Sequence, residues 1–289
     1  MKDKEILVLA IQKAGRLYQQ THKLLIASFL HIVNGEVPRL RLRAKNFPVQ
    51  ILYLRDDDIP ACVKDGVADA GIVGENVVVE KGHPVKLVER LGFARCKLSI
   101  GIPQNMPYTG TDDLTGLNIA TSYPNILKKF LLKNRIKARI HEISGSVEIA
   151  PGIGLADAIF DIVSSGSTLL SNGLKEVEKV MSSEAVLIGQ KTLTDAKQRL
   201  LETLLFRFRA AIKARHYRYI LLNVPDHAIP EVCRILPGMK SPTIMPLATE
   251  GWSSLHSVIA EDEFWEIIAQ LKQVGAEGIL VMPIEKMIT

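Results

Sequence analysis

The chain has 289 residues, about twice the length of a typical single domain, so two or three domains are expected. Apolar residues make up 47% and charged residues 23%, which excludes a disordered chain, a coiled coil and a collagen-like fibre. Thirty-six basic residues against 31 acidic ones leave a net charge of +5, which favours anionic ligands without requiring nucleic acid.

Three widely spaced cysteines, Cys62, Cys96 and Cys233, form no C-x-x-C pair, so the sequence predicts neither a disulfide framework nor a thiolate zinc site. No apolar run approaches the roughly 18 to 20 residues that cross a bilayer. The apolar stretch 6–11 is also too short for the core of a signal peptide. We therefore expect a cytoplasmic protein with no membrane partner and, because aromatics are only 6%, no nucleic-acid partner.

The first seventy residues alternate between strand and helix periodicity, which is typical of an α/β fold. An apolar strand over 5–11 precedes a helix that begins near Gly15. Strands near 39–44 and 49–54 precede a second helix from Asp57.

Basic and apolar residues alternate in the first of these two later strands, so Arg39, Arg41, Arg43 and Lys45 share one face. These cations either attract a polyphosphate or block pairing at the edge of the sheet. The sequence assigns the segment Arg39 to Lys45 no secure role.

One short pattern occurs twice. Residues 66–77 predict the end of a helix, a buried strand, a glycine turn and a new helix, and the pattern returns from Gly154 onward. Asp69 recurs as Asp157, 157 − 69 = 88 residues later. A long repeat that occurs only twice predicts two similar lobes facing each other across a cleft.

After about residue 216 the order changes to strand, helix, two strands, helix and strand. The strands are expected at 219–224, 243–247, 255–260 and 278–282, and the helices at 228–236 and 262–274. This βαββαβ order is the ferredoxin-like plan, which often serves as a small regulatory or oligomerising module. The expected domains are a first lobe (1–95 with 185–215), a second lobe (96–184) and a C-terminal domain (216–289).

The densest polar cluster, Ser164 to Thr168, follows a buried strand and opens a helix. Backbone N–H groups, hydroxyls and the positive helix end converge there, as phosphate binding requires. The alternative is a cap that only satisfies the helix's own donors. Asp157 and Asp161, just upstream, could hold ribose hydroxyls or a magnesium ion bound to a diphosphate.

Further candidates lie at other strand ends. Lys13 and Arg16 flank Gly15 where the first strand gives way to a helix, the edge at which parallel sheets bind ligands. Arg55 ends another strand, and Glu148 either complements a helix dipole or serves as a functional carboxylate.

The sequence contains no H-E-x-x-H, G-x-S-x-G or Walker A motif, so catalysis would depend on positioning and charge. Thr121-Ser122-Tyr123-Pro124 repeats the strand-to-helix design, and Ser122 is the expected N-cap of the helix that follows.

Seven segments spread over nearly the whole chain form one set. They are Gln-Lys-x-Gly-Arg-Leu (12–17), Leu-Arg-Asp-Asp-Asp-Ile-Pro (54–60), Ala-Asp-Ala-Gly-Ile-Val-Gly-Glu-Asn (68–76), Ala-Thr-Ser-Tyr-Pro (120–124), Gly-Ser-Val-Glu-Ile-Ala-Pro (145–151), the stretch 157–168 and Pro-Ile-Glu-Lys-Met (283–287). Together they resemble the long-form ATP phosphoribosyltransferase family, which catalyses the first step of histidine biosynthesis.

The resemblance implies two lobes of type II periplasmic-binding-protein topology and a C-terminal ACT-like domain that senses histidine. It also implies the reaction: the adenine N1 of ATP displaces pyrophosphate from C1 of 5-phosphoribosyl 1-diphosphate, with Mg2+ as cofactor. Histidine is the implied feedback inhibitor, and the implied assembly is a homo-oligomer of dimers that build hexamers.

The resemblance also implies a set of site residues, each carried over from a matching segment. The phosphoribosyl donor is expected to bind at Asp157, Ser164, Ser165, Gly166, Ser167 and Thr168, and ATP at Lys13, Gly15, Arg16, Arg55, Asp69 and Gly74. The expected catalytic residues are Asp157, Asp161, Glu148 and Arg16. The expected effector site contains Thr243, Leu247 and Ser257. Magnesium is expected through the substrate diphosphate, with Asp157 or Glu148 as candidate ligands.

A function from another class is a non-enzymatic two-lobed sensor that closes on an amino acid or nucleotide. The lack of a signal peptide argues against an exported binding protein, and the lack of a helix-turn-helix argues against a regulator. Calorimetry separates the two, because a sensor binds one small ligand and the transferase binds two.

Overall fold

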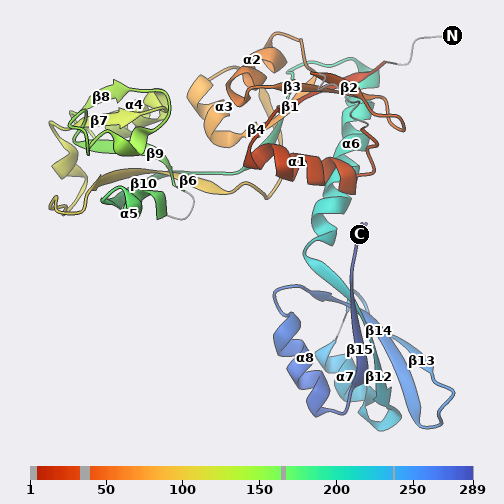
Figure 1. Cartoon of the computed structure of the whole chain (residues 1–289). Helices are drawn as coiled ribbons and strands as arrows, with labels where there is room; N and C mark the ends of the chain where they lie inside the picture. Colours follow the sequence, from red (N-terminus) through yellow and green to blue (C-terminus); the bar gives the residue numbers. More distant parts are fainter. Residues whose placement is uncertain (1–4, 33–39, 164–166, 237, 289) are drawn as a thin grey trace. The chain divides into compact units, whose positions relative to one another are not determined.

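The structure is a computed structural model that describes residues 5–32, 40–163, 167–236 and 238–288. It contains two compact units, one of Met1–Lys23 with His31–Leu201 and the other of Leu24–Leu30 with Glu202–Thr289. The described strands form a six-stranded, a five-stranded and a four-stranded sheet (Figure 1). Within the described ranges, no helix is both long enough and apolar enough to cross a membrane.

The six-stranded sheet has the order β2-β3-β1-β4-β11-β5. Its strands are Arg41–Arg43 (β2), Val49–Leu54 (β3), Leu7–Gln12 (β1), Ala70–Gly74 (β4), Ala185–Gly189 (β11) and Lys86–Arg90 (β5). β1 is parallel to both β3 and β4, and the helices α1 (Arg16–Ala27), α2 (Ile59–Lys64) and α3 (Glu75–Lys81) follow these three strands. β1 and β3 are almost continuously apolar because the sheet is buried on both faces. We call this sheet with its helices lobe I.

The five-stranded sheet has the order β10-β6-β9-β7-β8. Its strands are Leu174–Ser183 (β10), Cys96–Pro103 (β6), Ala158–Val163 (β9), Asn118–Thr121 (β7) and Arg139–Glu142 (β8), with the helices α4 (Pro124–Lys133) and α5 (Ser167–Ser171). β7 is parallel to β8 and β9, so these three strands end at one edge. We call this part lobe II. The chain enters it between β5 and β6 and leaves it between β10 and β11.

An aspartate ahead of a buried strand makes the same pair of hydrogen bonds in both lobes. In lobe I, the Asp69 N–H donates to the Val8 carbonyl (2.9 Å) and the Asp69 carboxylate accepts from the Val8 N–H (2.8 Å). In lobe II, Asp157 and Asn118 repeat both bonds, at 2.9 and 2.8 Å. The two aspartates therefore hold β4 against β1 and β9 against β7, and the 88-residue repeat encodes this clamp.

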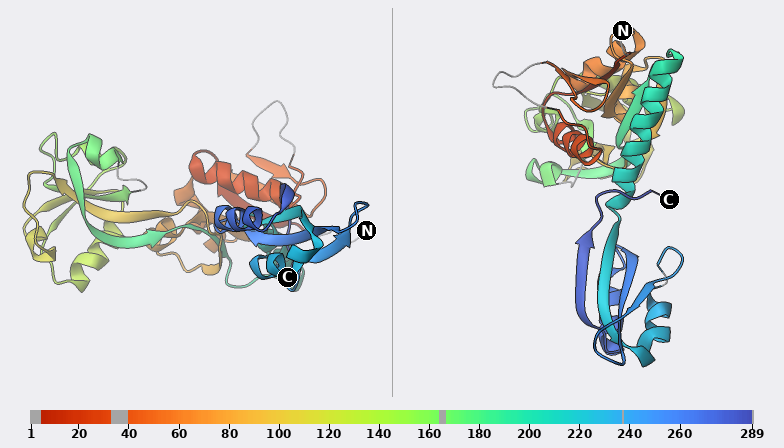
Figure 2. Two further views of the ribbon diagram at one scale, coloured as in Figure 1. Left: turned by 90° about the horizontal axis from the view of Figure 1, so that it is seen from below. Right: turned by 90° about the vertical axis from the view of Figure 1, so that its right-hand side faces the viewer.

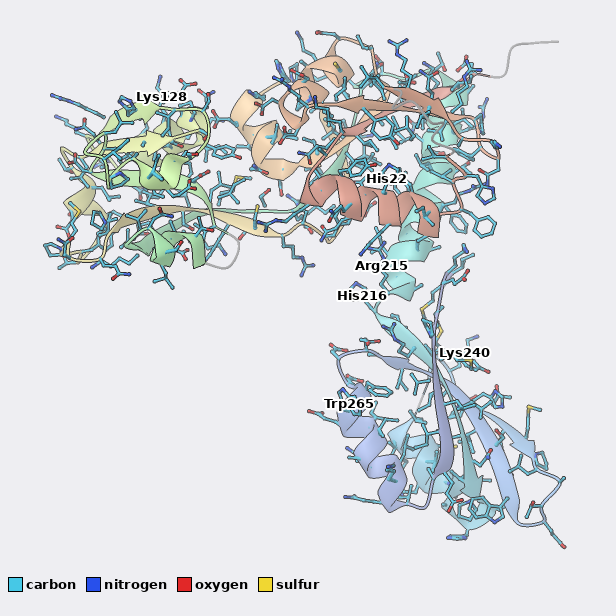
Figure 3. The ribbon with its side chains drawn as sticks, viewed as in Figure 1. His22, Lys128, Arg215, His216, Lys240 and Trp265 are labelled. Carbon is cyan, nitrogen blue, oxygen red and sulfur yellow. The ribbon has the colours of Figure 1, made fainter. Side chains whose placement is uncertain are left out.

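The four-stranded sheet belongs to the second unit and has the antiparallel order β13-β14-β12-β15. Its elements are β12 (Tyr217–Pro225), α7 (Ile229–Ile235), β13 (Thr243–Pro246), β14 (Trp252–Ala260), α8 (Phe264–Gln273) and β15 (Glu277–Pro283), preceded by α6 (Asp195–Ala214). Both short helices cover one face of the sheet (Figure 2), which is the ferredoxin-like arrangement expected from the βαββαβ order. Trp265 on α8 is 79% exposed, so it is not a core residue (Figure 3).

The two clamps differ in burial, which predicts different costs for the same substitution. Asp69 is buried and also pairs with the Lys197 ammonium at 2.8 Å, whereas Asp157 is exposed. An asparagine retains an acceptor oxygen, but at position 69 it leaves Lys197 without its ion pair. We expect Asp69→Asn to lower the free energy of unfolding by about 2 kcal/mol and Asp157→Asn by less than about 1 kcal/mol. Urea denaturation followed by circular dichroism measures both, and equal losses would contradict this difference.

Candidate active site

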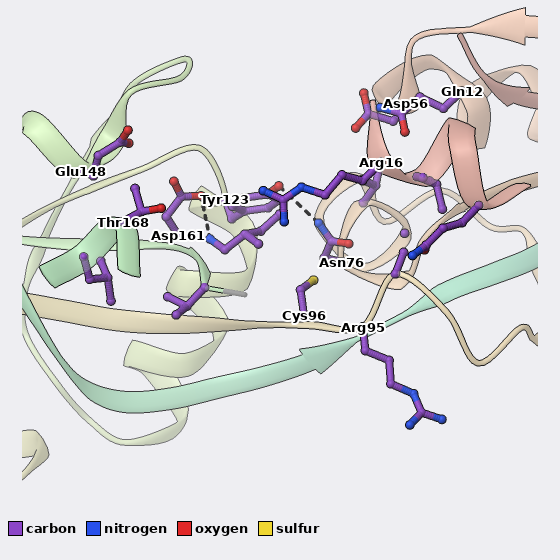
Figure 4. Close-up of a pocket in the computed structure, with 18 of the residues that line it drawn as sticks. Gln12, Arg16, Asp56, Asn76, Arg95, Cys96, Tyr123, Glu148, Asp161 and Thr168 are labelled. Atoms are coloured by element: carbon purple, nitrogen blue, oxygen red, sulfur yellow. Dashed lines mark hydrogen bonds between the residues drawn. The ribbon is translucent and has the colours of Figure 1, made fainter. Parts of the chain in front are cut away.

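A cavity of about 500 Å³ lies between lobes I and II, at the carboxyl ends of their parallel strands (Figure 4). From lobe I, Gln12 ends β1, Asp56 follows β3 and Gly74 ends β4. From lobe II, Tyr123 follows β7 and Asp161 lies near the end of β9. This edge of a parallel sheet is where ligands bind in such folds, so the cavity is the candidate active site.

The wall from lobe I carries amides, a guanidinium and the Asp56 carboxylate. Arg16, Leu17 and Gln20 share the face of α1 that borders the cavity, and Arg16 reaches into it (Figure 4). Gly15, with φ of +91°, lets the chain turn from β1 into this helix. Guanidinium and amide groups suit the phosphates and the base of a nucleotide.

Asn76 adds an amide to this wall from the first turn of α3. The residue before this helix is Gly74, and a Cβ atom there would collide with the Asn76 carboxamide oxygen. Glycine at position 74 therefore leaves room for the Asn76 amide.

The wall from lobe II carries two carboxylates and a hydroxyl, from Glu148, Asp161 and Thr168. Burial and, to a smaller extent, the negative charge of Glu148 raise the pKa of Asp161 to about 6, although the Ile162 N–H, 2.7 Å from the carboxylate, lowers it. Asp161 therefore changes charge close to neutral pH.

Tyr123 lies between the walls. The Asn76 side-chain amide donates to its hydroxyl oxygen at 3.2 Å (Figure 4). Burial and the neighbouring Asp161 charge raise the pKa of Tyr123, so its hydroxyl proton remains available for donation to a ligand. Burial also raises the pKa of Cys96, which lines the cavity as a protonated thiol.

Five of the residues predicted from the sequence line this cavity: Arg16, Gly74, Glu148, Asp161 and Thr168. Ser164, Ser165 and Gly166 lie outside the described residues, and Ser167 is described only as the first backbone position of α5.

Lys13, Gly15 and Arg55 do not line the cavity. Lys13 is exposed just after β1, where its N–H donates to the Leu54 carbonyl at 2.9 Å. Arg55 is exposed directly before the turn that carries Asp56, so the aspartate lines the cavity and the arginine does not.

Asp69 and Asp157, which the resemblance places beside the ligands, do not line this cavity. Both lie at the amino end of a strand, where they clamp a neighbouring strand. Asp157 directly precedes β9 and Asp161 is the fourth residue of the strand, so the two lie about 13 Å apart at the rise of a strand. One strand cannot bring both carboxylates to the same edge.

The lining includes polar residues that the sequence reasoning did not select. Gln12, Asp56, Asn76 and Tyr123 all lie inside the conspicuous segments, but capping or packing explained them equally well. Gln20 lies outside those segments, and only its position one helical turn after Arg16 could have marked it.

The predicted effector residues lie on or beside the C-terminal sheet but do not share one face. Ser257 on β14 is buried, and its hydroxyl has no partner among the described residues. Thr243 on β13 pairs with His256, so the pleat places Thr243 and Ser257 on opposite faces of the sheet. Leu247 follows β13, and its N–H donates to the Trp252 carbonyl at 2.9 Å.

The basic strand is the edge strand β2. Arg41 and Arg43 are exposed, Leu42 between them is buried, and Arg39 lies outside the described residues. These arginines are not part of the cavity lining. Their arrangement fits protection of a sheet edge.

Comparison with known proteins assigns the chain to a family. A family model described as ATP phosphoribosyltransferase matches residues 55–210, and one described as "HisG, C-terminal domain" matches residues 214–286. An ATP phosphoribosyltransferase of Cytophaga hutchinsonii is 59% identical over 98% of this chain and 99% of its own length. One from Bacteroides thetaiotaomicron is 56% identical over 98% of this chain and all of its own length.

A solved structure supports the fold. The chain matches one titled as an ATP phosphoribosyl transferase (HisG:HisZ) complex from Thermotoga maritima with a TM-score of 0.60 and 24% identity, over 71% of this chain and 99% of the other. These relationships do not favour the non-enzymatic sensor. The chain belongs to the ATP phosphoribosyltransferase family and acts in histidine biosynthesis.

Proposed function

We propose that ATP and 5-phosphoribosyl 1-diphosphate meet in the cavity, with ATP on the wall from lobe I and the phosphoribosyl donor on the wall from lobe II. The observation that carries this proposal is the different chemistry of the two walls. Gln12, Arg16 and Asn76 supply hydrogen-bond donors from lobe I, together with one carboxylate, that of Asp56. Glu148 and Asp161 supply carboxylates from lobe II, beside the start of α5.

In this proposal the bond from adenine N1 to C1 of the ribose forms as the bond from C1 to the diphosphate oxygen breaks. Pyrophosphate leaves with the bonding electrons, and the sugar develops positive charge in the transition state. The Asp161 and Glu148 carboxylates stabilise that charge, and Arg16 binds substrate phosphate. The reaction then needs no protein nucleophile, which agrees with a protonated Cys96.

A divalent metal accompanies this reaction in the family, and we propose Mg2+. No group of three or more His, Cys, Asp and Glu side chains suited to a metal exists within the described part of the chain. The carboxylates of Glu148 and Asp161 nevertheless fit Mg2+, which takes one or two carboxylates and completes its shell with water and phosphate oxygens. These two side chains would hold the ion, whose charge would neutralise the diphosphate. Asp157, which does not line the cavity, is not included in this ligand set.

Asp161 and Asp157 provide a matched pair for testing the site. We expect Asp161→Asn to lower kcat by about 10²-fold, because a carboxylate facing the developing charge is lost. Asp157→Asn should stay within about threefold of the parent chain, since its carboxylate binds Asn118 outside the cavity. Formation of phosphoribosyl-ATP in the presence of Mg2+ and pyrophosphatase measures both. The proposed site is wrong if Asp157→Asn loses as much activity as Asp161→Asn.

The pH dependence gives a second test of Asp161. Because its carboxyl stabilises positive charge only when ionised, kcat/KM should rise with pH; the pKa of Asp161 is about 6 without metal, and bound Mg2+ moves this acidic limb to lower pH. Glu148→Gln removes a charge that raises this pKa, so the acidic limb should move to lower pH. If the acidic limb of the kcat/KM profile is unchanged in Asp161→Asn, the limb reports the titration of another group.

The same raised pKa affects stability with a defined sign. Protonated Asp161 stabilises the fold fully below its unfolded pKa near 4, and that contribution is lost as pH rises through about 6. At pH 8, Asp161→Asn should therefore be more stable than the parent chain, by roughly 2 kcal/mol after allowance for solvent screening. Thermal unfolding at pH 4 and pH 8 measures the difference.

We further propose two catalytic lobes, one formed by residues 1–95 with 185–215 and the other by residues 96–184. The domain 216–289 is proposed to bind histidine as a feedback inhibitor. The chain is proposed to form dimers that assemble into hexamers. The histidine site is supported by the separate ferredoxin-like sheet and by the buried Ser257 hydroxyl, which has no partner among the described residues.

Substitutions of Ser257 and Thr243, which lie on opposite faces of the C-terminal sheet, test which face binds histidine. We expect histidine to inhibit the full chain, and Ser257→Ala to raise the inhibitory concentration about tenfold without changing kcat. Thr243→Val tests the opposite face. Loss of inhibition only in Thr243→Val would move the site to that face, and no inhibition of the parent chain would refute the proposal.

A further inference from the structure

Helix α4 of lobe II is capped by a side chain from lobe I. Its preceding residue, Tyr123, makes no side-chain cap, and the expected N-cap Ser122 does not provide one. The Glu80 carboxylate, from α3 of lobe I, accepts from the Asn125 N–H and from the Ile126 N–H, each at 2.9 Å. The two oxygens of one carboxylate thus satisfy two of the free donors in the first turn of α4.

The contact is reciprocal and buried. The Asn125 side-chain amide donates to the Glu80 carbonyl oxygen at 3.1 Å, so the backbone of α3 is held as well as its side chain. Glu80 is only 7% exposed. A buried carboxylate is costly unless it is hydrogen-bonded, and the positive end of a helix is a favourable partner for it. The N–H groups that stabilise the buried Glu80 carboxylate therefore belong to lobe II.

A second contact lies one helical turn earlier on α3. The Asn76 side chain donates to the Tyr123 hydroxyl at 3.2 Å and accepts from the Ser183 hydroxyl at 2.9 Å. Ser183 ends β10, where the chain returns to lobe I. Asn76 thus joins lobe I, the start of α4 and one of the two connections between the lobes. We call Asn76 and Glu80, with these partners, the interlobe latch.

The latch borders the cavity on one side. Tyr123 and Asn76 both line it, while Glu80 does not. The two lobes are also joined by the connections before β6 and after β10, and Val79 of α3 packs against the core of lobe II. Transfer between substrates on opposite walls requires their reacting atoms to be held at a defined separation.

We propose that Glu80 is a positioning residue for the transfer step: by capping α4 from lobe I, it sets the separation of the two walls and the position of Tyr123. The inference rests on the proposed placement of the substrates on opposite walls. Glu80 touches neither substrate in this account. Its removal should slow the transfer and leave the affinity for each substrate alone unchanged.

Glu80→Gln tests this most sharply, because it preserves shape while replacing one acceptor oxygen by a donor. We expect amide exchange at Asn125 and Ile126, followed by NMR, to accelerate at least about tenfold. The single-turnover rate at saturating substrates should fall about 10- to 100-fold. Calorimetry with ATP alone and with 5-phosphoribosyl 1-diphosphate alone should give affinities within about threefold of the parent chain.

The control is Glu266→Gln. Glu266 is an exposed residue of α8, in the unit that contains the C-terminal sheet, so its substitution should leave all three measurements unchanged. Asn125→Ala removes only the reciprocal bond from an exposed side chain, and should slow single turnover about threefold even if Glu80→Gln does not fold.

Several outcomes would overturn the proposal. An unchanged turnover rate with accelerated exchange would make the latch structural only, and weaker binding with an unchanged rate would make Glu80 a binding determinant. Unchanged exchange would show that the latch does not protect α4 in solution. Failure of the proposed function is distinguishable, because the parent chain itself would then fail to bind both substrates or form product.

Discussion

The cavity depends on a repeated backbone interaction, in which an aspartate directly ahead of a buried strand holds that strand parallel to its neighbour. Asp69 holds β4 against β1, and Asp157 holds β9 against β7, through the same two hydrogen bonds. Because the clamped strands start in register, their carboxyl ends reach the same edge. Residues that follow those ends, such as Gln12 and Tyr123, then form the walls of the cavity.

The two walls divide the chemistry and must still act together. Carboxylates on lobe II suit a sugar that develops positive charge, while amides and Arg16 on lobe I suit a nucleotide. Burial, with a smaller contribution from the Glu148 charge, raises the pKa of Asp161 to about 6, so this carboxyl changes charge near pH 6. Glu80 occupies the positive end of α4, which leaves that helix end satisfied within the protein and unavailable to substrate phosphate.

The α/β order, the lobe repeat and the C-terminal ferredoxin-like sheet were predictable from periodicity and glycine turns, because these signals are local. Membership of Arg16, Glu148 and Thr168 in the cavity was predictable from their positions after strands, and that of Asp161 from its position just upstream of the cluster Ser164 to Thr168. The clamp role of Asp157 was not, because the sequence does not show which end of a strand faces the ligand. The capping of α4 by Glu80 joins residues 45 positions apart, so local capping rules selected Ser122 instead.

Hydrogen exchange of the full chain with each substrate separately tests the central claim that opposite walls bind different substrates. Neither substrate reacts alone, so the natural compounds can be used with Mg2+. ATP should slow exchange in peptides covering residues 12–20 and 74–77 of lobe I, and 5-phosphoribosyl 1-diphosphate in peptides covering residues 159–171 of lobe II. Protection of the same lobe by both substrates, or of neither wall by either, would contradict the account.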